Sequence, residues 1–185
     1  MGANVKKVIN SAHNDEYAML VDLPDGVKLT GSSVAVSATQ TRPNNTTAYT
    51  ALDVVGQDPA ANMEFATGLD LGAGFVIYGA RLRIDAAAIP AGMTSFRLHL
   101  YNAAPTAIAD NAAFNLIAAD RAKYLGYVVI PEPVDNGDTL WGQSDHVNFT
   151  GKLAATSIYG VLQTVGAYTP TALVVKTVSL FMAPL

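Results

Sequence analysis

Apolar and polar residues alternate in several short stretches of this chain, most clearly in the segment from Ser95 to Gly126. In the run from Phe96 to Tyr101, every second residue is Phe or Leu, and the residues between them are Arg97, His99 and Tyr101. A period of two places successive side chains on opposite faces of a β-strand. The pattern therefore predicts a strand with one face in the core. We expect Arg97, His99 and Tyr101 to face outward, toward solvent or a neighbouring subunit.

Similar stretches follow one another along the chain, separated by turns rich in Gly, Pro and Asn. Besides 96–101, the expected strands cover residues 33–41, 49–55, 65–71, 75–84, 127–130, 147–153, 157–165 and 172–182. The last of these is long and bounded by prolines, so we expect it in the middle of a sheet. Asn-Gly within Asp135–Asp138 predicts a tight hairpin turn. One short helix is expected over residues 114–124, from its loose helical spacing.

This organisation predicts an all-β fold, an antiparallel β-sandwich and, among sandwiches, a jelly roll. No helical pattern separates the strands, which disfavours a parallel α/β sheet. The sandwich domain is expected to cover residues 31–185. Residues 1–30 differ in composition, with Lys6, Lys7 and a Pro-Asp-Gly turn. We interpret them either as an N-terminal arm or as peripheral strands of the same domain.

The composition points to an assembly subunit. Half of the residues are apolar and 14% are charged, against about 25% charged in ordinary soluble domains. A net charge of −4, with Lys6-Lys7 as the one adjacent basic pair, argues against a nucleic-acid partner because phosphate neutralisation needs clustered cations. No stretch has the length or continuity of a membrane helix or signal peptide. The absence of cysteine excludes disulfides and thiolate metal sites.

The residues that carry chemistry form no recognisable catalytic pattern. His13, His99 and His146 lack the spacing of metal ligands, and most aspartates lie in predicted turns, where their side chains bond nearby backbone N–H groups. No nucleophile elbow, phosphate loop or dinucleotide motif is present. We therefore expect no enzymatic activity, no metal and no cofactor. Trp141 with Tyr159 or Tyr168 is a candidate sugar platform, although burial of Trp141 at one end of the sandwich is the favoured interpretation.

Three groups of segments carry a resemblance. They are Thr41–Val55, then Arg97–Tyr101 with Pro105-Thr106, and finally Asp110–Phe114 with Tyr124–Gly126. Together they resemble a family of tailed-bacteriophage proteins that is usually encoded among virion structural genes. The resemblance covers roughly residues 33–185. At the position before Asp53, where the family pattern has Gly, this chain has Leu52.

The resemblance implies a virion protein assembled in the host cytoplasm, most simply a head decoration (cement) protein. Such a protein would bind the major capsid protein and associate with itself, often as a trimer. The candidate interface residues are Lys6, Lys7, Tyr17, Arg97, His99 and Tyr101. A tail or head-fibre component and a jelly-roll module that binds host glycans are the alternatives.

Overall fold

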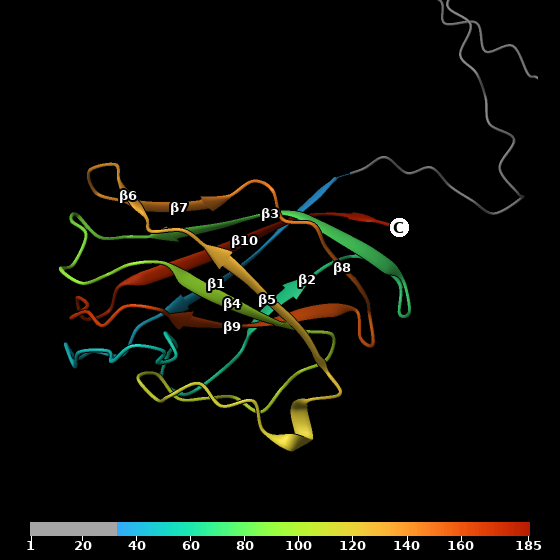
Figure 1. The fold of residues 1–185 in the computed structure, drawn as a ribbon, viewed down its shortest axis with the longest axis horizontal. Helices are drawn as coiled ribbons and strands as arrows, with labels where there is room; N and C mark the ends of the chain where they lie inside the picture. Colours follow the sequence, from blue (N-terminus) through green and yellow to red (C-terminus); the bar gives the residue numbers. More distant parts are fainter. Residues whose placement is uncertain (1–32) are drawn as a thin grey trace, which may run out of the picture. The chain divides into compact units, whose positions relative to one another are not determined.

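A computed structural model describes residues 33–185, which form two antiparallel β-sheets packed face to face (Figure 1). The elements in chain order are β1 (Val34–Thr41), β2 (Met63–Ala66), β3 (Gly74–Ile84), β4 (Phe96–Tyr101), the 3-10 helix η1 (Ala118–Asp120), β5 (Tyr124–Ile130), β6 (Val134–Asp135), β7 (Leu140–Ser144), β8 (Phe149–Lys152), β9 (Ser157–Thr164) and β10 (Val175–Pro184). The expected arm, residues 1–30, lies outside the described residues.

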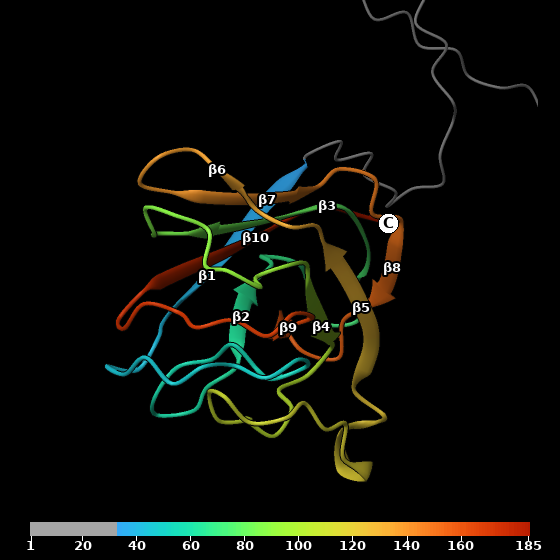
Figure 2. The ribbon, with the colours of Figure 1, turned by 60° about the vertical axis from the view of Figure 1, so that its left-hand side comes forward.

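The strands pair in a nested order. β1 pairs with β10, β2 with β9, β3 with β7 and β4 with β5, all antiparallel. One sheet has the order β1-β10-β3-β7-β6, with β8 also on β3, and the second has the order β2-β9-β4-β5 (Figure 2). Nested pairing arises when one long antiparallel hairpin wraps around itself, which is the topology of a jelly roll. The predicted all-β sandwich is confirmed.

The core lies between the inner faces of the two sheets. Val178, Leu180 and Met182 of β10 point inward and are at most 1% exposed, while the residues between them lie on the outer face. From the second sheet Phe96 and Leu98 meet them, also fully buried, as the alternation predicts. Burying each such side chain contributes about 1.5–3 kcal/mol. β10 lies between β1 and β3, so the expected central position of the last strand is confirmed.

Two predicted elements have a different form. The expected strand 49–55 is a loop held by isolated bridges from Tyr49, Asp53 and Val54. The expected helix 114–124 reduces to the short η1 (Ala118–Asp120). The reason is that Phe114 is tied to the second sheet, with its backbone N–H donating to Leu52 O at 3.2 Å. A segment anchored in this way cannot form a regular helix.

The expected hairpin turn is present between β6 and β7. Asn136 N–H donates to Thr139 O at 2.9 Å, and Gly137 has a φ of 92°, a value that favours glycine. β7 itself is not among the predicted strands. In the part of the chain that the structure describes, no helix has the length and hydropathy needed to cross a membrane.

Candidate functional site

The outer face of the first sheet carries a polar ladder. Alternation places Ser37 and Thr39 of β1 outward, directly opposite Ser179 and Thr177 of β10. The hydroxyl pairs lie 2.7 Å apart for Ser37 and Ser179 and 3.0 Å apart for Thr39 and Thr177. Such cross-strand hydroxyl pairs stabilise a sheet modestly. They leave a flat, uncharged strip along β1 and β10.

Beside this strip, an arginine lies between two aromatic rings. The guanidinium carbon of Arg81 on β3 is 4.7 Å from the ring centroid of Trp141 on β7 and 4.7 Å from that of Phe181 on β10. The Phe181 ring has room because Gly79 lies opposite it, where a Cβ would approach Phe181 Cδ2 to 3.3 Å. We call Arg81, Trp141 and Phe181 the arginine clamp. Stacking of this kind holds the guanidinium in place.

The charge of Arg81 has no carboxylate partner within the described residues. Arg81 belongs to none of the ion pairs of residues 33–185, and its buried Nε has no hydrogen-bond partner there. Arg83, two residues along the same strand, does pair, with its Nε 3.0 Å from Asp85 Oδ1. A positioned guanidinium with unused donors suits a planar carboxylate, which it can bind through two parallel hydrogen bonds. The clamp is therefore a candidate recognition site for an acidic group.

A second polar cluster is buried at one end of the sandwich. Arg42 is 1% exposed and follows β1 on its inward face. Its Nε donates to Tyr49 Oη at 3.0 Å and its Nη2 to Thr47 O at 2.7 Å, while Nη1 donates to Asn45 O. Tyr49 in turn donates to Asp110 Oδ1 at 2.6 Å. Burial, together with Asp110, raises the pKa of Tyr49 above its ordinary value. The cluster ties three loops to the sheet.

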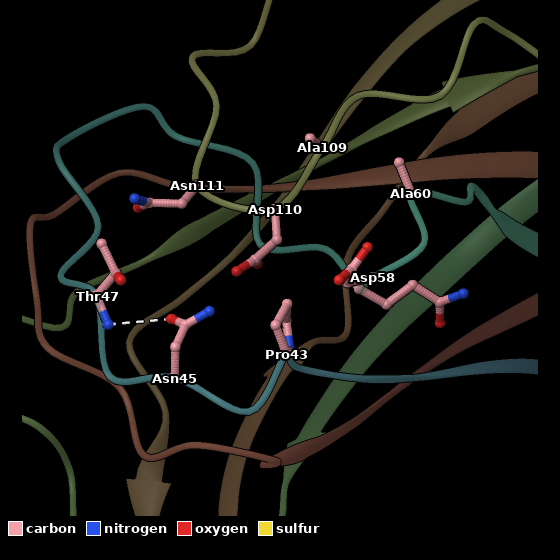
Figure 3. A pocket seen from close by; sticks show the side chains of 9 residues that line it. Pro43, Asn45, Thr47, Asp58, Ala60, Ala109, Asp110 and Asn111 are labelled. Atoms are coloured by element: carbon pink, nitrogen blue, oxygen red, sulfur yellow. Dashed lines mark hydrogen bonds between the residues drawn. The ribbon is translucent and has the colours of Figure 1, made fainter.

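A surface depression of about 310 Å³ lies over this cluster. Figure 3 shows the loops that carry Asn45, Asp58 and Asp110 meeting around it. Within it, Thr47 N–H donates to Asn45 Oδ1 at 3.1 Å. The Asp110 carboxylate already accepts from Tyr49 and, at 2.9 Å, from Gly56 N–H. Its two bonds fix the loops, so we assign Asp110 a structural role.

The expected exposure of the outward residues on β4 is wrong for two of them. His99 is 5% exposed and Tyr101 is 2% exposed, so neither is available to a neighbouring subunit. Their side chains do point away from the main core. A second apolar cluster covers them, built by Tyr101 with Val54 and Val161 and by the loop residues Ile108, Phe114, Leu116, Tyr124 and Tyr159. Alternation fixes the direction of a side chain, whereas the returning loop after β4 decides its exposure.

His99 lies within a chain of hydrogen bonds. Its Nδ1 is 3.0 Å from Tyr124 Oη and its Nε2 is 3.1 Å from Gln163 Oε1, while Gln163 Nε2 donates to Leu52 O at 2.9 Å. Because the Gln163 oxygen can only accept, His99 Nε2 carries the proton and Nδ1 accepts from Tyr124. Phe114 stacks on the ring at 3.7 Å. Burial lowers the pKa of His99, which keeps the imidazole neutral.

The remaining candidates are dispersed. Arg97 is partly buried, with its guanidinium 5.3 Å from the Tyr127 ring. Lys6, Lys7 and Tyr17 lie outside the described residues. Trp141 lies on the outer face of the first sheet rather than buried at an end of the sandwich. Tyr168 is 5% exposed and is not available as a sugar platform. In residues 33–185, no three His, Cys, Asp or Glu side chains gather as a metal site.

Sequence reasoning missed the arginine clamp because its three residues come from three different strands. The alternation of β3 does place Arg81 and Arg83 on one outer face, and that signal is present in the sequence. The neighbours of Arg81 depend on the order of β7, β3 and β10, which the pattern does not fix. In comparisons with known proteins, no family model matches the chain and no curated protein matches it.

Proposed function

We propose that this chain is a structural protein of a tailed-bacteriophage virion, most simply a head decoration protein that binds the capsid shell. The low charged fraction supports a subunit that lies against other proteins. The jelly roll supplies a rigid platform with a flat outer face. We propose a role without catalysis, in which protein–protein contacts stabilise the shell after assembly in the host cytoplasm.

One observation carries this proposal: the arginine clamp on an exposed sheet face. Arg81 is partly buried and held between Trp141 and Phe181, so little side-chain entropy remains to be lost when a partner binds. The matching group on the partner is a carboxylate side chain of the major capsid protein. Residues with this geometry, Trp and Arg in particular, dominate the energy of protein interfaces.

The test is cosedimentation of the full chain with shells assembled from the major capsid protein alone. Arg81→Gln should weaken binding about tenfold or more, because hydrogen bonds between charged groups contribute about 1.5–3 kcal/mol. Arg83→Gln is the matched control, since Arg83 lies on the same face and already pairs with Asp85. Equal binding by wild type and Arg81→Gln, or no binding by either protein, would overturn the proposal.

Copy number separates decoration from the tail or head-fibre alternative. A decoration protein covers the head lattice and is present in hundreds of copies per particle. A tail or fibre component is present in a few tens or fewer. Quantitative mass spectrometry of purified virions distinguishes the two, and electron microscopy of the same particles places the density on the head or the tail.

A glycan-binding module is the second candidate, favoured by the outward position of Trp141. One ring of Trp141 stacks on Arg81, and an arginine beside an aromatic ring also suits an acidic sugar. Glycan-array binding by the wild type that is lost in Trp141→Ala would support this candidate. If Trp141→Ala loses shell binding and the wild type binds no glycan, the decoration role is favoured.

A further inference from the structure

The two sheets end in four edge strands, and one of these edges is unprotected. β1 and β6 are the ends of the first sheet, and β2 and β5 are those of the second. Edge strands present unpaired N–H and C=O groups, and proteins usually protect them with charges, prolines, bulges, short length or a covering segment. We propose that β1 pairs antiparallel with β1 of a second copy of this chain, which makes a two-fold dimer.

Three of the edges carry such protection. β6 has two residues, and β2 has four, of which Glu64 is charged. β5 is longer, but its pairing with β4 is irregular next to Gly126. A Cβ on Gly126 would lie 3.1 Å from Phe149 Cε2 of β8, and a Cβ on Gly142 of β7 would lie 3.0 Å from Ile130 Cγ2. Side chains and backbone from β7 and β8 thus cover both ends of β5.

β1 has none of these features. Its eight residues, Val34–Thr41, include no charged residue and no proline, and all eight pair with β10 without a register shift. The outward residues Ala35, Ser37, Thr39 and Thr41 are all exposed. Inward, Val36 is 7% exposed and Ala38 9%, whereas Val178 of the neighbouring β10 is fully buried. The difference indicates that the flank of β1 is open, and within the described residues no other strand pairs with it.

A second copy of β1 suits this edge better than a charged strand does. Antiparallel pairing about a two-fold axis sets each residue against one from the same uncharged strand, so no like charges oppose each other. The inward faces of both copies remain on the same side of the joined sheet. The hydroxyl ladder of Ser37 and Thr39 continues across the junction, as it does already onto β10. Because each copy has one such edge, the assembly closes at two.

This pairing does not depend on the capsid contact through Arg81, and it differs from the trimer that the resemblance implies. Sedimentation equilibrium of the full chain should give a concentration-dependent dimer. Ser37→Lys/Thr39→Lys should yield a monomer, because lysines on both copies then face each other near the axis. Thr177→Lys, on the neighbouring central strand, is the control and should remain dimeric. A trimer, or an unchanged dimer in the double variant, would overturn the proposal.

Single cysteines test the geometry, because the chain has no cysteine of its own. Under mild oxidation, at least one of Ala35→Cys, Ser37→Cys and Thr39→Cys should form a covalent dimer, since residues opposite each other in antiparallel strands lie within disulfide reach. Ser179→Cys on β10 is the control and should stay reduced. If none of the three cross-links more than this control, the two-fold pairing is wrong.

Amide hydrogen exchange in the full chain identifies the occupant of the edge. Every second amide of β1 points away from β10, and dimerisation should protect these amides more as the protein concentration rises. Protection that is independent of concentration in a monomeric protein would assign the edge to another segment of the same chain. Fast exchange at all concentrations would mean that the edge is unpaired. Either of these results would overturn the proposal.

Discussion

Lys176 donates a hydrogen bond of 2.7 Å from its Nζ to the carbonyl oxygen of Gly56, at a position where the lysine is 1% exposed. Lys176 lies on the inward face of β10, directly opposite Gln40 of β1. Burial lowers its pKa to about 8. The protein therefore keeps a lysine at the polar end of its core, close to Arg42.

The first prediction is that stability rises with pH between 8 and 10. In this window the unfolded chain binds a proton at Lys176, where the ordinary lysine pKa of 10.5 applies, and the folded chain largely does not. The free energy of unfolding therefore increases with pH, by about 2–3 kcal/mol at most. Urea unfolding at pH 7.5, 9 and 10 measures the change. Lys176→Met should remove the slope, and a slope retained in that variant would exclude Lys176 as its cause.

Above pH 10 the buried tyrosines act in the opposite direction. Burial raises the pKa values of Tyr49, Tyr101 and Tyr168 above the ordinary tyrosine value of 10.0. In the unfolded chain these phenols lose their protons near pH 10, while the folded chain keeps them. The free energy of unfolding must then fall with pH. The stability curve should show a maximum close to pH 10.

The second prediction concerns Arg42, whose guanidinium binds two loop carbonyls and the Tyr49 hydroxyl. Arg42→Met leaves these acceptors buried and removes the cation 3.8 Å from Asp110. Breaking a buried arrangement of this kind costs about 3–5 kcal/mol. The urea midpoint should fall accordingly. Arg83→Met, which removes an exposed pair with Asp85, should change stability by about 0.5 kcal/mol or less. Equal effects would mean that Arg42 does not hold the loops.

The sequence predicts the faces of strands better than their surroundings. Alternation correctly separates Leu98 from His99, because the period of two is a property of the backbone. It does not show that Phe114, fifteen residues later, returns to stack on His99. That contact depends on the course of a long loop, which has no periodic pattern. The exposure of a residue is thus harder to predict than its direction.

The arginine clamp illustrates the same limit for a site. Arg81, Trp141 and Phe181 are separated by 40 or more residues in the sequence, and each lies on a strand with an ordinary alternating pattern. Only the order β7-β3-β10 brings them together. In a jelly roll the neighbours of a strand are mostly distant in the sequence. Sites on its sheets therefore need the topology before they can be recognised.

The third prediction is that acid weakens the fold through His99. Burial lowers its pKa below the ordinary histidine value of 6.5, so the folded chain resists protonation while the unfolded chain accepts it. As the pH falls below about 6.5, the free energy of unfolding should decrease. The facing groups are Tyr124, Gln163 and Phe114, with Arg97 on the same strand adding a cation that also disfavours protonation. Chemical unfolding from pH 7 to 5 measures the effect. His99→Gln should flatten the profile, and an unchanged profile would assign the acid sensitivity to another group.

The fourth prediction concerns Leu52, which has a φ of 73° and is 43% exposed. Its N–H donates to Thr164 O at 3.0 Å, and its carbonyl accepts from Phe114 and Gln163, so the conformation is imposed by its neighbours. A side chain at positive φ costs about 1–2 kcal/mol, and glycine avoids this cost while adding freedom to the unfolded chain. Leu52→Gly should therefore raise the free energy of unfolding by about 0.5–1 kcal/mol. Leu71→Gly is the control, since Leu71 is 68% exposed without a positive φ and should lose stability. A loss in both variants would show that the Leu52 side chain contributes more through packing than its backbone costs.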